Sequence, residues 1–112
     1  MKRGILALLG LFIAASFSPA QARLSNFSQR GYATQQMQDA GLTAAHPSLP
    51  YGSRVRVTNL ATGREAEVTI TGRIPASRDR IIDLSPAAAQ AVGLGTGGAV
   101  RLSRGIPPPA SP

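Results

Sequence analysis

The sequence predicts a small, mainly β domain that closes into a barrel of short strands and carries one or two short helices. Three observations predict this class. Apolar and polar residues alternate in short segments, glycine- and proline-rich loops separate these segments, and one stretch has signals for both ends of a helix. Closure is favoured because it leaves no exposed sheet edge in so small a domain. The 112 residues suffice for one such domain.

The first 22 residues have the pattern of a secretory signal peptide. Lys2 and Arg3 precede an apolar run, 5–15, and the triplet Ala20-Gln21-Ala22 has the small-x-small pattern of a cleavage site. The run is shorter than the roughly 20 residues that span a bilayer, so we expect cleavage after Ala22 and no stable membrane anchor. The chain contains no cysteine, so we expect neither a disulfide nor a lipid-bearing cysteine at the mature N-terminus. These features predict a periplasmic or secreted protein.

Residues 23–104 are expected to form the barrel domain and residues 105–112 a proline-rich, disordered tail, since proline cannot join the middle of a sheet. Without the signal peptide, the chain has ten arginines and five acidic residues, which gives a net charge of +5. Such a surface favours anionic partners. Export makes peptidoglycan, with its carboxylates, the nearest one, and the scattered arginines argue against nucleic acid. We expect a monomer.

The clearest strands form a predicted hairpin. Valines alternate with arginines in 54–58, and aliphatic residues alternate with glutamate and threonine in 65–70. The intervening Ala61-Thr62-Gly63 is a turn signal. Arginine and glutamate side chains on the outer face are expected to pair across the two strands. Upstream, the polar arm 23–40 is expected to be loosely ordered, with one strand near 31–34.

The C-terminal half alternates turns with short elements. Residues 71–80 are expected to form a loop, and Ile81-Ile82 a short buried strand. The segment 85–93 has an N-cap serine, a proline at the first helical position and a glycine stop, which together predict a helix. Gly97-Gly98 is expected to be a turn before the last strand, 99–102.

Three segments carry a resemblance to a known family. They are Leu42–His46, which reads Leu-Thr-Ala-Ala-His, then Leu49–Leu60, then Arg80–Ser85 with the alanines that follow it. The stretch from about residue 31 to residue 102 resembles the rare lipoprotein A family. The resemblance implies a six-stranded double-psi β-barrel that acts on peptidoglycan as an endolytic lytic transglycosylase, on glycan strands without stem peptides. Expansins share this barrel and have a similar Asp-Leu-Ser segment.

The resemblance also assigns catalytic positions. A lytic transglycosylase needs a carboxyl group that protonates the glycosidic oxygen and then helps the sugar's own 6-hydroxyl to attack the anomeric carbon. Without a gap, the family's catalytic aspartate falls on Gly72 and a second family acid falls near Gln35. Neither side chain donates a proton in this way. Three functions therefore stay open. One is a transglycosylase whose acid lies elsewhere, and another is a barrel that binds glycan strands without cutting them. Expansin-like loosening through Asp83, without cleavage, is a third.

Five other residues make up the predicted site. Asp83 is the first candidate for the acid, and the alternative is a carboxylate that bonds backbone N–H groups. His46, the only histidine, is expected to contact substrate or carry a proton, or else to be a hydrogen-bonded structural residue. Arg73 is expected to hold a lactyl or peptide carboxylate, with loop carbonyls as the alternative partners. Tyr51 and Tyr32 are expected to stack on sugar rings. One histidine, no cysteine and scattered acids predict neither metal nor cofactor.

Overall fold

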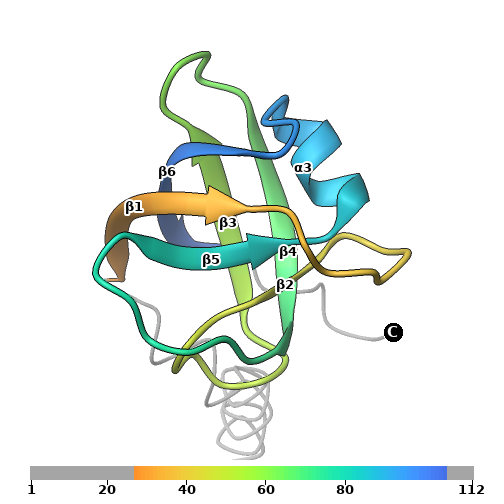
Figure 1. The fold of residues 1–112 in the computed structure, drawn as a ribbon, viewed down its shortest axis with the longest axis vertical. Coiled ribbons are helices and arrows are strands. Elements are labelled where there is room, and N and C mark those ends of the chain that lie inside the picture. The colour runs from red at the N-terminus through yellow and green to blue at the C-terminus, as the bar shows by residue number, and fades with distance from the viewer. Residues whose placement is uncertain (1–26, 106–112) are drawn as a thin grey trace, which may run out of the picture.

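The computed structural model describes residues 27–105. In chain order, the elements are β1 (Ser28–Thr34), β2 (Thr43–Ala45), β3 (Arg54–Asn59), β4 (Glu65–Gly72), β5 (Arg80–Leu84), α3 (Pro86–Val92) and β6 (Gly97–Arg104). The strands close into a barrel in the order β1-β5-β2-β4-β3-β6 (Figure 1). The predicted mainly β barrel is confirmed, with a single short helix in the described part of the chain. The predicted signal peptide and residues 106–112 of the predicted tail lie outside that part.

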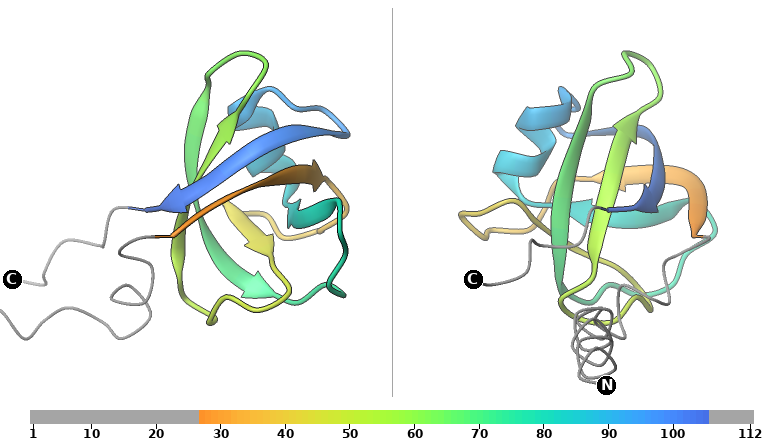
Figure 2. Two further views of the ribbon diagram at one scale, coloured as in Figure 1. Left: turned by 90° about the vertical axis from the view of Figure 1, so that its left-hand side faces the viewer. Right: turned by 180° about the vertical axis from the view of Figure 1, so that it is seen from behind.

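Two pairings in the barrel are parallel, β1 with β5 and β2 with β4, whereas the others are antiparallel. β1 pairs along its whole length with β6, from Ser28 opposite Ser103 to Thr34 opposite Gly97. Figure 2 shows these two strands side by side along one wall of the barrel. β2 pairs with β4 and β5 and with neither of its neighbours in sequence, β1 and β3. Long loops therefore connect it to both, and these loops lead to the candidate site described below.

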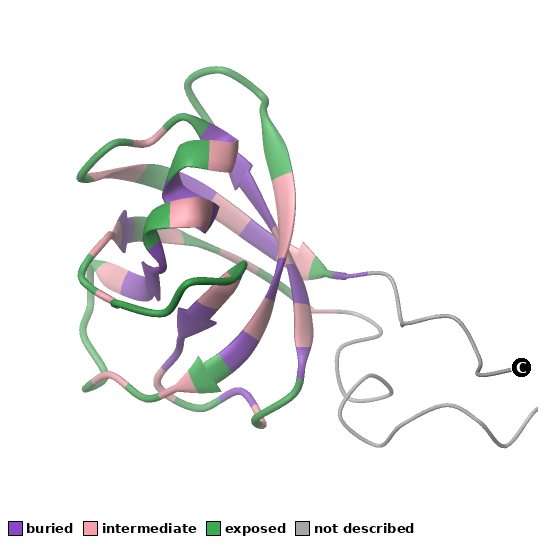
Figure 3. Ribbon diagram, turned by 90° about the vertical axis from the view of Figure 1, so that its right-hand side faces the viewer, coloured by how far each residue is buried: buried purple, intermediate pink, exposed green. Residues whose placement is uncertain are grey.

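The barrel interior is filled by the alternating aliphatic side chains that the sequence pattern predicts. Val55, Val57, Val68 and Ile70 of the hairpin are buried, as is Leu102 of β6. Figure 3 shows buried residues interspersed with half-buried ones along these strands. Burial of each such side chain contributes about 1.5–3 kcal/mol, so this shared core holds the walls of the barrel together.

Two glycines allow close approach between strands. A β-carbon on Gly31 would lie 2.6 Å from Cγ2 of Ile81, and one on Gly97 would lie 2.7 Å from the carbonyl oxygen of Ala33. The Tyr32 ring also covers Gly97, with Cε2 3.1 Å from that point. The turn predicted at 97–98 is wrong, because Gly97 and Gly98 are the first two residues of β6. Gly97 lets β1 and the Tyr32 ring pack against this strand.

Other element boundaries also differ from the prediction. β4 continues through Thr71 and Gly72, which were expected in a loop, because Gly72 pairs with Ala45 of β2. β1 begins at Ser28, inside the arm expected to be loosely ordered, because β6 supplies its partners. β2 has only three residues and no apolar alternation, so no local pattern predicts it. Gly105, the first residue of the predicted tail, is buried and donates its N–H to the Arg54 carbonyl oxygen at 2.9 Å.

The β3–β4 hairpin and its charged outer face are confirmed. Gly63 in the turn has φ +82°, a left-handed conformation that glycine adopts without strain. Arg54 lies 3.2 Å from a carboxylate oxygen of Glu67, and Arg56 lies 3.6 Å from Glu67 and 3.9 Å from Glu65. Such partly exposed pairs contribute less than about 1 kcal/mol each, so we assign this face no function.

The helix α3 is confirmed at both ends. The Ser85 side chain accepts a hydrogen bond from the N–H of Ala88, and Gly93 takes φ +74° at the C-cap. Ala88, Ala89 and Val92 are buried, and α3 lies beside β4 (Figure 1). Within residues 27–105, no helix has the length and apolar character needed to cross a membrane.

Candidate functional site

Four residues on neighbouring strands form a row across the barrel wall. Gly72 of β4 is opposite Ala45 of β2, Ala45 is opposite Asp83 of β5, and Asp83 is opposite Thr34 of β1. Neighbouring strands lie about 4.8 Å apart, so the Gly72 and Asp83 backbones are on the order of 10 Å apart. The position assigned to the family's catalytic aspartate and the remaining candidate acid thus lie close together.

The Asp83 carboxyl group is held through one of its oxygens. Oδ1 accepts hydrogen bonds from the Thr34 hydroxyl at 2.8 Å and from the Gln36 backbone N–H at 2.7 Å. Oδ2 makes no hydrogen bond within the described residues, yet no buried side-chain oxygen or nitrogen there lacks a partner. Oδ2 is therefore in contact with solvent, although the residue as a whole is only 5% exposed. The group thus has one oxygen fixed by two hydrogen bonds and one that is not fully buried.

His46 is buried, and both of its ring nitrogens are engaged. Nδ1 accepts hydrogen bonds from the backbone N–H groups of Ser48 and Leu49, each at 3.1 Å. The ring proton must then be on Nε2, which donates to the Gln29 side-chain oxygen at 3.0 Å. Burial lowers the pKa of His46, and the neighbouring Arg73 charge lowers that pKa further. The ring is neutral and shapes the loop after β2, and its predicted role in substrate contact or proton transfer stays a prediction.

Arg73 and Tyr51 lie beside Gly72. Nη1 of Arg73 donates to the carbonyl oxygens of His46 at 3.1 Å and Leu49 at 2.7 Å. Its guanidinium carbon lies 4.4 Å from the centre of the Tyr51 ring, which is 61% exposed. Arg73 thus makes the loop contacts that were the alternative to carboxylate binding. Its predicted role as a substrate ligand, like that of Tyr51, stays a prediction.

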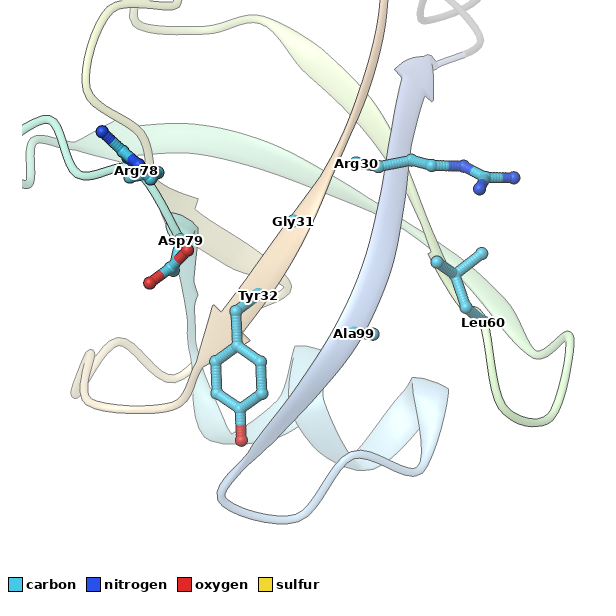
Figure 4. Close-up of a pocket in the computed structure, with 7 residues that line it drawn as sticks. All are labelled: Arg30, Gly31, Tyr32, Leu60, Arg78, Asp79 and Ala99. Carbon is cyan, nitrogen blue, oxygen red and sulfur yellow. The ribbon is translucent and has the colours of Figure 1, made fainter.

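Tyr32 does not belong to this cluster. It lies on β1, opposite Ala99 of β6, with 48% of its surface exposed. It lines a separate cavity, shown in Figure 4, to which His46, Arg73 and Tyr51 do not contribute. The structure therefore groups four of the five predicted site residues around Gly72 and places the fifth elsewhere.

The loop between β1 and β2 adds residues that sequence reasoning missed. The terminal carbon of Met37 lies 3.5 Å from the point that a β-carbon on Gly72 would occupy. Asp39 Oδ2 accepts hydrogen bonds from the hydroxyls of Thr43 and Thr71, each at 3.1 Å. A second carboxylate is therefore bonded to the residue that precedes Gly72. Nothing in the polar sequence of this loop marks either residue.

The described residues offer no evident metal ligands. Within 27–105, no group of three or more histidine, cysteine, aspartate or glutamate side chains is placed to hold a metal ion. The chemistry available around Gly72 is that of two hydrogen-bonded carboxyl groups, Asp83 and Asp39, together with the neutral imidazole of His46 and the Arg73 guanidinium.

A closed six-stranded barrel with two parallel pairings and a polar cluster beside the connecting loops is the arrangement of a double-psi β-barrel protein. The family described as lytic transglycolase has a model that matches residues 20–103. The chain belongs to this family, and the resemblance drawn from Leu42–His46 and the two later segments is confirmed.

Individual relatives agree with this assignment. The chain is 47% identical over 73 residues to the probable endolytic peptidoglycan transglycosylase RlpA of Nostoc sp., a match that covers 64% of this chain and 20% of the relative. It is 48% identical over 69 residues to the endolytic peptidoglycan transglycosylase RlpA of Pseudomonas aeruginosa, covering 61% and 20%. For the Escherichia coli K12 protein of the same name, the values are 45% over 78 residues, 70% and 21%. The chain spans about a fifth of the length of these curated relatives.

Proposed function

We propose that this chain binds peptidoglycan glycan strands where Gly72 and Asp83 lie, and cleaves them as a lytic transglycosylase with Asp83 as the acid. The observation that carries this proposal is the Asp83 carboxyl group, which has one oxygen fixed by two hydrogen bonds and the other in contact with solvent. The relatives described above are all named as peptidoglycan transglycosylases, which supports the class of substrate.

In the proposed reaction, Asp83 Oδ2 gives its proton to the glycosidic oxygen, and the bond from that oxygen to the anomeric carbon breaks. The sugar's 6-hydroxyl oxygen bonds to the anomeric carbon and returns its proton to Oδ2. The product is a 1,6-anhydro end, no water is consumed, and one carboxyl group serves both steps. The bonds from Thr34 and Gln36 to Oδ1 keep the group in one orientation, and such positioning lowers the barrier.

The other cluster residues support this role by shaping the surface. Neutral His46 and Arg73 fix the loop that presents the Tyr51 ring. An exposed aromatic ring next to a cation offers an apolar face for a sugar and a positive charge for its carboxylate. In this proposal His46 acts as a positioning residue, and Asp83 is the only proton donor.

The test is a digest of glycan strands that carry no stem peptides, followed by mass spectrometry for 1,6-anhydro ends. Wild type is expected to produce them, and Asp83→Asn, which keeps an oxygen for Thr34 and Gln36, is expected to lose at least about 100-fold in rate. Glu65→Gln, which removes an acid from the charged hairpin face, is the control and keeps wild-type activity. Equal activity in wild type and Asp83→Asn would remove Asp83 from the mechanism.

Binding without cleavage is the second candidate, and Gly72 favours it. The position assigned to the family's catalytic aspartate has no side chain, and Met37 lies over it. In that case the same digest yields no anhydro ends, while wild type still sediments with purified cell-wall sacculi in moderate salt. Failure of both cleavage and sedimentation would exclude both candidates. Expansin-like loosening would leave strands uncut but make the sacculi more extensible.

The proposal places the protein outside the cytoplasm. The support is the signal-peptide pattern of residues 1–22, which lies outside the described part of the chain, and the peptidoglycan substrate named for the relatives. N-terminal sequencing of protein recovered from the periplasm or the medium should begin at Arg23. A chain that stays in the cytoplasm with Met1 in place would contradict this localisation.

A further inference from the structure

Two adjacent strands of the barrel carry positive charge and no acidic residue. β1 contains Arg30, and β6 contains Arg101 and Arg104, whereas neither strand contains aspartate or glutamate. Arg30 lies directly opposite Arg101 in the antiparallel pairing of these strands. Both point to the outer face, because Arg101 alternates with Val100 and Leu102, which are buried in the core. The outer face of β1 and β6, here called the arginine wall, therefore presents two adjacent positive charges.

These two opposed arginines have no partner in the described protein. Within residues 27–105, neither Arg30 nor Arg101 makes a side-chain hydrogen bond or ion pair, in contrast to Arg54 and Arg56 on the hairpin. Like charges directly opposite each other destabilise a sheet, so this pair does not serve the stability of the barrel. With β-carbons about 4.5–5.5 Å apart, the two guanidinium groups can both reach one phosphate, which accepts several N–H bonds at once.

Hydroxyl groups lie on one side of this pair along the strands, and apolar side chains lie on the other. Towards one end of the wall, Ser28 lies opposite Ser103 and adds two hydroxyl donors. Towards the other end, Tyr32 lies opposite Ala99, and the Leu60 N–H donates to the Ala99 carbonyl oxygen at 3.1 Å. Tyr32 is 48% exposed and Leu60 39%. A tyrosine ring with an apolar body and a hydroxyl tip suits the boundary between water and an apolar phase.

The neighbouring acid does not neutralise the arginine wall. Asp79 lines the same cavity as Arg30 and Leu60. In Figure 4, however, Asp79 and Arg78 lie on one side of β1, whereas the Arg30 side chain extends across β6 to the side on which Leu60 lies. The positive charge of the wall is thus next to exposed apolar surface and away from this carboxylate.

We propose that the arginine wall docks the protein reversibly on an anionic phospholipid surface. Arg30 and Arg101 bind lipid phosphate groups, and Tyr32 and Leu60 lie at the edge of the apolar layer. Anionic lipids attract each arginine near their surface, and tyrosine is enriched where membranes meet water. The apolar residues favour a membrane over a soluble phosphate polymer, because such a polymer would bind the arginines but leave Tyr32 and Leu60 in water.

The place of the wall in the barrel gives the docked protein a direction. In the closed strand order, β6 is three places from β2 in either direction, so these two strands lie on opposite sides of the barrel. β2 carries Ala45, which lies between Gly72 and Asp83 in the row that defines the candidate site. A protein docked through β6 therefore turns this site away from the lipid. The docking stands on the wall alone, whereas the use of this direction to reach glycan strands rests on the proposed function.

The test is sedimentation with vesicles at moderate salt. One set contains phosphatidylcholine alone, and the other contains phosphatidylcholine mixed with phosphatidylglycerol. Wild type should bind the mixed vesicles at least about tenfold more tightly. Arg30→Gln with Arg101→Gln should lose this preference and stay folded, because the change removes a repulsion within the sheet. Leu60→Ser should weaken binding to the mixed vesicles about threefold or more.

The control removes the same charge elsewhere. Arg54 and Arg64 bond to Glu67 and to the Gln90 carbonyl oxygen, outside the wall, so Arg54→Gln with Arg64→Gln should keep the preference. An equal loss in this control would mean that overall charge alone attracts the protein. Equal binding of both kinds of vesicle by wild type would mean that no anionic lipid is recognised. Either result overturns the proposal.

Two further measurements separate the remaining possibilities. If soluble polyphosphate binds wild type as tightly as the mixed vesicles do, and Leu60→Ser changes neither affinity, the partner is a phosphate polymer and the membrane proposal fails. Arg30→Gln with Arg101→Gln should still cleave free glycan strands at the wild-type rate. Wild type that binds the mixed vesicles but cleaves no strand would contradict the proposed function and leave the docking surface intact.

Discussion

The terminal carbon of Met37 lies 3.5 Å from the point that a β-carbon on Gly72 would occupy, so Met37 fills part of the space at this position. The other close neighbour of that point is the β-carbon of Ala45, at 3.3 Å. Gly72 does not have a positive φ, so its backbone accepts a side chain without strain. A larger residue at 72 therefore requires only a small shift of Ala45 and a rearrangement of the flexible methionine.

This geometry predicts that Gly72→Asp folds and gains or increases cleavage of glycan strands. The new carboxyl group would stand in the row that also contains Asp83, and a general acid contributes about 10²–10⁴-fold to such a reaction. Release of 1,6-anhydro ends measures the gain. Gly72→Asn has nearly the same size without an acid, so it should give no gain. A folded Gly72→Asp that cleaves no faster than Gly72→Asn would contradict the assignment of this position.

Protonation of His46 should destabilise the fold. Its folded-state pKa is lowered by burial and by Arg73, so the stabilisation is complete above the unfolded pKa near 6.5 and is lost as pH falls through the folded pKa. Urea unfolding at about pH 7.5, 6 and 5 should therefore show stability declining with acidity. His46→Asn, whose oxygen can accept the Ser48 and Leu49 N–H groups, should decline less. Parallel pH profiles would show that His46 is not the titrating group.

Arg73→Met should lower the free energy of unfolding by about 1–2 kcal/mol in the absence of any substrate. The variant loses both hydrogen bonds to the loop after β2 and the contact with the Tyr51 ring. Chemical denaturation measures the change, and Arg104→Met, at the exposed end of β6, should stay within about 0.5 kcal/mol of wild type. Unchanged stability would leave substrate binding as the role of Arg73.

Ser85→Ala should destabilise the protein by about 2–3 kcal/mol. The buried Ser85 hydroxyl donates to the Gly41 carbonyl oxygen at 2.7 Å and accepts from the N–H groups of Ala88 and Thr43. It thus caps α3 and also attaches the loop that carries Met37. Thermal unfolding compared with Ser77→Ala, in an exposed loop, isolates the effect. A loss below about 0.5 kcal/mol would be that of an ordinary surface position and would contradict this double role.

The parts of the fold that the sequence predicts well are those specified by local chemistry. Alternating valines define the hairpin, and Ser85 with Gly93 defines the helix, because each signal lies within the element that it specifies. β2 and the first residues of β1 carry no such signal. They are strands because distant partners supply their hydrogen bonds, and pairing of that kind cannot be inferred from a short window of sequence.

The candidate site divides in the same way. Family resemblance led to Asp83, His46 and Arg73, and the structure brings them together around Gly72. The family resemblance did not indicate Met37 or Asp39, because these residues reach the site only through the path of the loop between β1 and β2.

The pairing of β1 with β6 has a consequence for how the chain folds. The first and last strands of the described barrel are neighbours, so closure must wait until nearly the whole domain is available. Contacts between residues so distant in sequence cost loop-closure entropy before they form and stabilise the fold. Domains dominated by such contacts typically fold in milliseconds to seconds. The barrel therefore cannot close until the last strand, residues 97–104, has joined it.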